Sequence, residues 1–132
     1  MMKRITFLFV LGLTLACSDE TPELTSIEEG TYEGTFTRSS DRQRNQSANV
    51  ILTFEDGAFT GASDQQKFPA ICRGSYEVNT SGILFSDSCI WTADFDWSLI
   101  LSGQFSIAKD RDNLILTKSR EDIIDIYQLT RQ

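Results

Sequence analysis

The chain has 132 residues, of which 19 are acidic and 12 are basic, giving a net charge of −7 with no histidine. This length suits one domain with a modest hydrophobic core. The negative charge argues against binding to nucleic acid and against electrostatic docking on anionic lipid. Because histidine is the commonest general base and the commonest ligand of catalytic zinc, the sequence predicts neither an enzyme nor a bound metal or cofactor.

The first twenty residues predict that the protein is exported. Lys3 and Arg4 precede an apolar run over residues 5–15, and the small residue Ala16 ends it. A basic start, an apolar stretch of about a dozen residues and a small residue before the cleavage point are typical of a secretory signal, and the stretch is too short to span a bilayer. We therefore expect residues 1–16 to form a signal peptide.

The next residue, Cys17, makes this signal resemble that of a bacterial lipoprotein, in which lipid is attached to the cysteine and cleavage leaves it as the first residue. An ordinary signal peptide with a chance cysteine is the alternative. Residues 18–20, Ser-Asp-Glu, are similar to the segment that sends lipoproteins of the Bacteroidetes group to the cell surface, although a solvated linker also fits. The resemblance implies a lipid anchor in the outer membrane, on its periplasmic or cell-surface face, with residues 17–29 as an acidic tether.

After the tether, apolar residues recur with a period of two, which is typical of strands with one buried face. Asp56 and Gly57 give a strong hairpin signal, because both turn positions favour a positive φ. Pairing across that turn sets Phe54 opposite Phe59. This register agrees with the hydrophobic pattern of the two strands.

A second hairpin is predicted around the turn-rich sequence Asn-Thr-Ser-Gly. If Val78 pairs with Ile83, the same register sets Cys72 opposite Cys89, and a non-hydrogen-bonded pair brings the two Cα atoms to about 4.5 Å. Such a pair fits a disulfide, which the oxidising compartment of an exported protein preserves. A reactive or metal-binding pair is the alternative, but the chain has no histidine, and no third thiolate remains once the first cysteine carries lipid.

Eight alternating runs without a convincing helix predict an all-β fold, an eight-stranded antiparallel up-and-down barrel in which no sheet edge is left unpaired. The strands are expected over residues 30–38, 48–55, 58–64, 71–79, 82–90, 97–107, 113–119 and 123–131, with longer loops at 39–47 and 89–96. Glycines fall on the inward face where the coiling of a barrel needs them, at Gly34, Gly61, Gly74 and Gly103.

The start and the end of this predicted barrel resemble the lipocalin-like small barrels of bacterial lipoproteins. Gly30-Thr31-Tyr32 is similar to the Gly-x-Trp start of lipocalins, with tyrosine in place of tryptophan, and Arg131 stands where that family packs a basic side chain over the aromatic ring. The resemblance implies that residues 30–132 form a lipocalin-like domain that binds a small apolar ligand inside the barrel. The expected partners are therefore the membrane and that ligand, with the protein a monomer.

Large aromatic side chains dominate the inferred inward face, and two interpretations of them stay open. They either line a ligand pocket or fill the interior, because an eight-stranded barrel is just wide enough for side chains to fill. The candidate ligand-binding residues are Tyr32, Phe36, Phe54, Phe59, Tyr76, Phe85, Trp97, Phe105 and Tyr127.

The two predicted loops support a second hypothesis, a protein-binding module. Small disulfide-bearing barrel lipoproteins include inhibitors of lysozyme that act through surface loops, and here an exposed Trp91 would anchor the contact. Arg38, Arg42 and Arg44 are expected to face solvent or to meet an acidic partner. A structural envelope protein with a filled core is the third alternative.

Three aspartates, Asp87, Asp94 and Asp96, lie close together in the sequence near the second loop. A calcium loop of the EF-hand type would need further oxygen ligands, a glycine at its sixth position and a closing glutamate, which this segment lacks. We therefore interpret the aspartates as part of a solvated loop with local turn hydrogen bonds.

Overall fold

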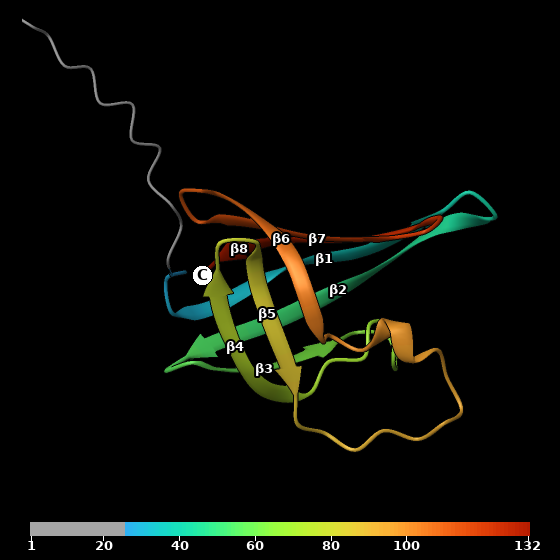
Figure 1. The fold of residues 1–132 in the computed structure, drawn as a ribbon, viewed down its shortest axis with the longest axis horizontal. Helices are drawn as coiled ribbons and strands as arrows, with labels where there is room; N and C mark the ends of the chain where they lie inside the picture. The colour runs from blue at the N-terminus through green and yellow to red at the C-terminus, as the bar shows by residue number, and fades with distance from the viewer. Residues whose placement is uncertain (1–25) are drawn as a thin grey trace, which may run out of the picture.

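The computed structural model describes residues 26–132, which form a closed barrel of eight antiparallel strands, as the sequence predicted (Figure 1). Strands that follow one another in the chain are neighbours in the barrel, and β1 pairs with β8 to close it. A short 3₁₀ helix, η1, precedes β6. The elements are β1 Gly30–Ser40, β2 Gln43–Glu55, β3 Ala58–Ser63, β4 Arg73–Asn79, β5 Gly82–Asp87, η1 Trp97–Leu99, β6 Gly103–Asp110, β7 Asn113–Arg120 and β8 Ile123–Arg131.

The turn between β2 and β3 has the chemistry that its sequence predicts. Asp56 and Gly57 have φ angles of 51° and 75°, as a two-residue hairpin turn with two left-handed positions requires. Phe54 pairs with Phe59 across this turn, in the predicted register. The local turn and the hydrophobic pattern therefore specify the same pairing.

The predicted disulfide between Cys72 and Cys89 is confirmed. The β4–β5 ladder pairs Val78 with Ile83, as predicted, and the two cysteines lie just beyond its last pair. Their Cα atoms are 6.4 Å apart. This distance exceeds the roughly 4.5 Å expected of directly paired residues, because Cys72 precedes β4 and Cys89 follows β5, so both lie outside the ladder.

Two of the predicted inward glycines lie where neighbouring strands approach too closely for a side chain. A Cβ atom at Gly34 would lie 1.8 Å from the carbonyl oxygen of Gln128, and one at Gly74 would lie 1.9 Å from the carbonyl oxygen of Ser86. No larger residue fits at such distances. The close approach lets the sheet coil tightly enough to close into a barrel.

The up-and-down order gives the barrel two different ends. We name the end with the start of β1 and the end of β8 the terminal end, and the opposite end the loop end. The terminal end carries the short turns 56–57, 80–81 and 111–112. The loop end carries the short turns 41–42 and 121–122 and both long connections, 64–72 and 88–102. In Figure 1 the β1–β2 and β7–β8 hairpins project farthest at the loop end, away from the C-terminus.

Two predicted boundaries at the loop end are wrong. The expected loop 39–47 is mostly an extended hairpin, because β1 continues to Ser40 and β2 begins at Gln43. Residues 43–47 are exposed on both faces of the projecting hairpin, so they lack the alternation that marks a half-buried strand (Figure 1). The sixth strand begins only at Gly103, whose φ of 86° is a conformation that favours glycine.

The residues just before β1 close the terminal end with an apolar side chain. Ile27 belongs to the buried core, and the Tyr32 hydroxyl donates to the carbonyl oxygen of Glu28 at 2.7 Å. Residues 27–29 thus pack against the barrel, although the sequence assigns them to the tether. The predicted signal peptide, Cys17 and the rest of the tether lie outside the described residues. Within residues 26–132, no helix is long and apolar enough to cross a membrane.

Candidate functional site

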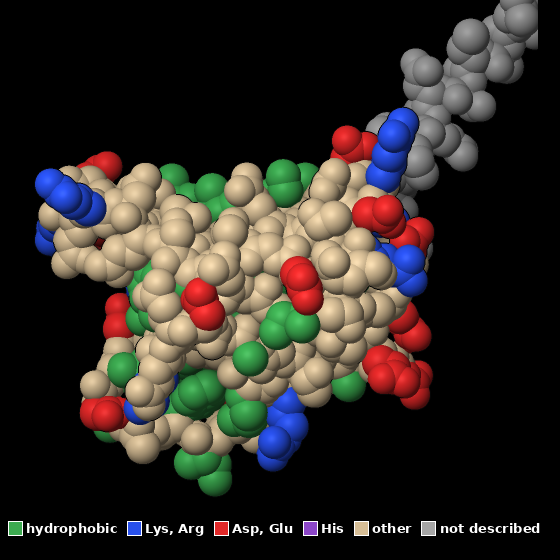
Figure 2. All heavy atoms as spheres, turned by 180° about the vertical axis from the view of Figure 1, so that it is seen from behind, with side chains coloured by type: hydrophobic (Ala, Val, Ile, Leu, Met, Phe, Trp, Pro, Cys, Tyr) green, Lys and Arg blue, Asp and Glu red, His purple; other side chains and the backbone are tan. Residues whose placement is uncertain are grey.

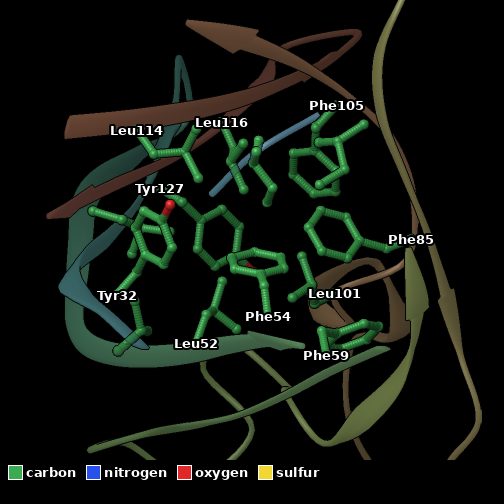
Figure 3. Close-up of a cluster of buried hydrophobic side chains, with 14 of the residues drawn as sticks. Tyr32, Leu52, Phe54, Phe59, Phe85, Leu101, Phe105, Leu114, Leu116 and Tyr127 are labelled. Atoms are coloured by element: carbon green, nitrogen blue, oxygen red, sulfur yellow. The ribbon is translucent and has the colours of Figure 1, made fainter. Parts of the chain in front are cut away.

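Aromatic rings fill the centre of the barrel, where Figure 3 shows them pointing toward one another among leucine side chains. The ring centroid of Phe85 lies 5.2 Å from that of Phe59 and 5.6 Å from that of Phe105, both with the rings nearly perpendicular. Edge-to-face contacts of this kind are a favoured packing of aromatic side chains. The predicted interior rings that are buried are Tyr32, Phe36, Phe54, Phe59, Phe85, Phe105 and Tyr127.

Two of the predicted interior rings lie elsewhere. Tyr76 is only partly buried at the edge of the cluster, with its ring centroid 5.0 Å from that of Phe54. Trp97 was predicted to point inward, which is wrong, because it lies on η1 and is 56% exposed. Burial raises the pKa of the Tyr127 hydroxyl, as expected in an interior with little water. The described interior therefore favours the filled core over a ligand pocket.

The residues that resemble the lipocalin pattern lie at the terminal end. Arg131 is the β8 partner of Tyr32 in the register, and its Nε donates to the carbonyl oxygen of Glu29 at 2.8 Å. The guanidinium lies against Gly30, where a Cβ atom would be 3.1 Å from Nε. Arg131 thus fastens the chain that enters β1.

At the loop end the interior is polar and charged. Asp125 on β8 is 3% exposed and accepts two hydrogen bonds from Arg38 on β1, from Nε to Oδ1 and from Nη2 to Oδ2, both at 2.7 Å. Such a forked pair is among the strongest ion pairs in proteins. Burial lowers the pKa of Arg38, but the hydrogen bond and the charge of Asp125 outweigh burial and raise this pKa overall. The prediction that Arg38 faces solvent is therefore wrong, whereas Arg42 and Arg44 are exposed.

Two further cations on β7 lie beside this pair. Arg120 Nη2 lies 3.3 Å from Asp125 Oδ2, and Lys118 is the register partner of Asp125. Lys118 Nζ donates to the carbonyl oxygen of Ser102 at 2.8 Å and lies 5.2 Å from the ring centroid of Phe105. Burial and, next, the charge of Arg120 lower the pKa of Lys118. We name Arg38, Lys118, Arg120 and Asp125 the ionic cluster.

Reasoning from the sequence missed the ionic cluster, although a signal was present. Lys118 continues the inward alternation of Leu114 and Leu116, and Asp125 precedes Tyr127 in the same way on β8. A charged residue at an inward position near the end of a strand needs a partner inside the barrel, because an unpaired buried charge is costly. The alternation therefore placed these residues inside, but Arg38 meets Asp125 only through the register between β1 and β8, which no hairpin turn sets.

Arg38 also holds η1 over the loop end. Its Nη1 donates to the Ser98 hydroxyl at 3.0 Å and lies 3.2 Å from Asp96 Oδ2, and its Nη2 donates to the Ser98 carbonyl oxygen at 3.2 Å. Asp96 caps η1 by accepting a hydrogen bond from the Ser98 amide at 2.9 Å. Hydrogen bonding to Ser98 is the main reason that the pKa of Asp96 lies below its usual value.

The connection 88–96 has no regular secondary structure, yet it is fastened at several points. The disulfide at Cys89 ties its start to the residue before β4. The Trp91 indole nitrogen donates to Asp87 Oδ2 at 2.6 Å, and the Trp91 ring lies against Phe95 with the centroids 5.7 Å apart. Lys67 belongs to the other long connection, 64–72, and its Nζ atom lies 5.0 Å from the centroid of the Phe95 ring. These contacts fix the shape of an exposed loop.

Large apolar side chains of this connection project into solvent. Ile90 is 100% exposed, and Trp97 is largely exposed with its indole nitrogen donating to the Thr92 carbonyl oxygen at 2.8 Å. Trp91, the predicted exposed anchor, is half-buried, so that prediction is wrong. In Figure 2 hydrophobic side chains gather along the lower side of the molecule, where Figure 1 places the connection between β5 and η1. We name Ile90, Trp91, Phe95 and Trp97 the apolar loop surface.

The three aspartates near this loop do not come together. Each is engaged by a different donor: Asp87 by Trp91, Asp94 by Lys67 at 3.0 Å, and Asp96 by Ser98. Within the part of the chain that the structure describes, no group of three histidine, cysteine or acidic residues is arranged to hold a metal ion.

No protein-family model matches the chain, and neither a curated protein nor a solved structure matches it. The candidate functional site therefore rests on the loop end itself. It consists of a fastened apolar surface beside a buried ionic cluster. This arrangement is suited to recognition of a partner.

Proposed function

We propose that this protein is a lipid-anchored envelope protein that binds another protein through the apolar loop surface. The observation that carries the proposal is the exposure of Ile90 and Trp97 on a connection that a disulfide and Arg38 hold in place. A surface with a fixed shape loses little conformational entropy on binding. Large side chains at the centre of a contact, tryptophan above all, contribute most of the binding energy in typical interfaces.

The filled interior supports binding on the surface over binding inside the barrel. Tyr32, Phe85 and Tyr127 are each 1% exposed and lie among other buried rings. A lipid-sized molecule would have to displace several of these rings, and each displaced ring would lose close-packed contacts. We therefore place the lipocalin-like carrier second and treat a bound apolar molecule as the competing outcome of the test.

The end of the barrel at which the chain enters β1 supports this function. The chain reaches β1 from the terminal end, where Ile27 packs into the core. Lipid on Cys17 would thus be attached on the side of the terminal end, and the loop end would be free to meet a partner. We expect the anchor to lie in the outer membrane, on its periplasmic or its cell-surface face.

Site-specific photocrosslinking in cells that make the full chain tests the proposal. A crosslinking amino acid at position 90 or 97 is expected to give one defined adduct with another protein. The same amino acid at Ile115, an exposed position on the outer face of β7, is the matched control and is expected to give none. Trp97→Ala should remove the adduct formed from position 90, while changing the free energy of unfolding by no more than about 0.5 kcal/mol because the side chain is exposed.

Native mass spectrometry of the same protein separates binding on the surface from binding in the barrel. An apolar molecule held noncovalently, retained in Trp97→Ala and accompanied by no adduct from position 90 or 97, would replace the proposal by the carrier function. An adduct from Ile115 as strong as that from position 97 would show that the apolar loop surface is not the contact.

A further inference from the structure

We infer that the ionic cluster binds a small oxyanion, a carboxylate or a phosphate, between Arg120 and Lys118. This site goes beyond the proposed protein-binding function and does not depend on it. The inference rests on the charge of the cluster, on the hydrogen-bond donors that its own residues leave unused, and on the spacing of the two β7 side chains.

The cluster holds more positive than negative charge. Arg38 and Arg120 contact one buried carboxylate, that of Asp125, and Lys118 is the register partner of Asp125 on β7. The more exposed Asp96 adds a second carboxylate at the rim. The whole chain has a net charge of −7, so a local excess of cations runs against its composition. Partly buried cations that lack a counter-charge are costly, and a bound anion would remove this cost.

The hydrogen-bond donors of the ionic cluster differ in how well they are satisfied. Arg38 donates from Nε, Nη1 and Nη2 at distances of 2.7 to 3.2 Å. Arg120, in contrast, makes only long contacts within the described part of the chain, at 3.3 Å to Asp125 and 3.4 Å to the Ser98 carbonyl oxygen. Its Nε atom is buried and has no hydrogen-bond partner among residues 26–132. Lys118 Nζ donates to Ser102 and carries three donors, so it has capacity for a second acceptor.

The spacing of the two side chains suits a single oxyanion. Lys118 and Arg120 are two residues apart on β7, so both point to the inner face with their Cα atoms about 6.7 Å apart. The Arg120 side chain is 34% exposed, so solvent reaches part of this side chain although its Nε atom is buried. Figure 2 shows the molecule hollowed at the loop end, between the projecting hairpins and the lower loop region. Burial is the main cause of the lowered pKa of Lys118, and the charge of Arg120 lowers it further.

The test is a titration of the ¹⁵N-labelled full chain followed by NMR, with sodium acetate in one arm and sodium phosphate in the other. Sodium chloride keeps the ionic strength constant throughout. We expect the Arg120 Nε–H signal to shift and to saturate in at least one arm, and the arm with the lower apparent Kd identifies the preferred anion. Arg120→Gln is expected to raise this Kd by about tenfold or more, read from the backbone amides of residues 102 and 118.

Arg73→Gln is the matched control, because Arg73 is an exposed arginine at the start of β4. It is expected to change the Kd less than about twofold, since an exposed charge is screened by salt. The proposed oxyanion site would be wrong if the Arg120 Nε–H signal shifted linearly in both arms without saturating. It would also be wrong if chloride alone produced the same shift. If Arg120→Gln does not fold, Lys118→Gln replaces it, and an unchanged Kd in the folded variant would equally overturn the site.

Discussion

The two ends of this barrel are closed by opposite means. At the terminal end, Ile27 enters the core and the Tyr32 hydroxyl and Arg131 donate to backbone carbonyl oxygens. At the loop end, Arg38 and Asp125 tie β1, β8 and η1 together through buried charge. A buried apolar side chain stabilises the fold wherever it lies, whereas a buried charge stabilises the fold only while its partner is present. Single substitutions are therefore expected to lower the free energy of unfolding much more at the loop end than at the terminal end.

The largest expected effect comes from Asp125→Asn. Removal of this charge leaves Arg38 and Arg120 facing a neutral amide in a buried position, so the free energy of unfolding should fall by about 3–5 kcal/mol in urea denaturation. Asp122→Asn is the matched control, in the turn just before β8, where Asp122 lies 3.4 Å from the exposed Arg42. Asp122→Asn should lower the free energy of unfolding by less than about 1 kcal/mol. Equal losses in the two variants would show that burial of the pair is unimportant.

Removal of the disulfide by Cys72→Ser with Cys89→Ser is expected to lower the free energy of unfolding somewhat less than Asp125→Asn does. The bridge spans 17 residues in sequence, for which the chain-entropy model gives about 3 kcal/mol. Hydrogen exchange measures where this stability is lost. Protection should fall most in the connection 88–102 and least around the turn 56–57 at the terminal end. A uniform loss at both ends would mean that the bridge stabilises the whole barrel and does not hold the loop in particular.

At the terminal end, Tyr32→Phe removes one hydroxyl and leaves the ring in place. The lost hydrogen bond to the Glu28 carbonyl oxygen should cost about 1 kcal/mol in urea denaturation. The side chain that closes this end, Ile27, is unchanged by the substitution. If Tyr32→Phe destabilised the protein as much as Asp125→Asn, the contrast between an apolar end and a charged end would be wrong.

The smallest expected effect is a pH dependence confined to the loop end. Hydrogen bonding to Ser98 holds the pKa of Asp96 below its usual 3.8, so the contribution of Asp96 is present above that value and is lost as the pH falls through the lowered pKa. The Ser98 amide signal in NMR should therefore titrate with a midpoint below 3.8 and stay unchanged between about pH 5 and pH 7. Asp96→Asn should abolish this titration. A midpoint above 3.8 would contradict the capping of η1.

The sequence predicted the barrel because two local signals agreed. The alternation around Phe54 and the turn at Asp56 and Gly57 gave one register for β2 and β3, and the Cys72–Cys89 pair followed from the register of the next hairpin. Both signals act over a few residues, so they can be recognised without knowledge of the rest of the fold. Closure of the barrel then followed from the number and order of the strands.

The parts that the sequence did not reveal depend on distant contacts. Trp97 continues the alternation of Leu99 and Leu101, but this segment is irregular and packs on the core only through some of its residues. Arg38 and Asp125 are 87 residues apart, and they meet because of the register between β1 and β8, two strands that no hairpin turn connects. Periodicity indicates which face a residue occupies. It does not indicate which residue of another strand it meets.

The even number of strands has a consequence of its own. In an up-and-down barrel, an even count returns the chain to the end where it began, and the amide of Gln132 accordingly donates to the carbonyl oxygen of Thr31 at 2.9 Å. The two chain ends of the domain are therefore adjacent. A short linker between them, with a new opening at the turn 121–122, would give a circular permutant that keeps all eight strands. An odd count would have left one chain end among the loops.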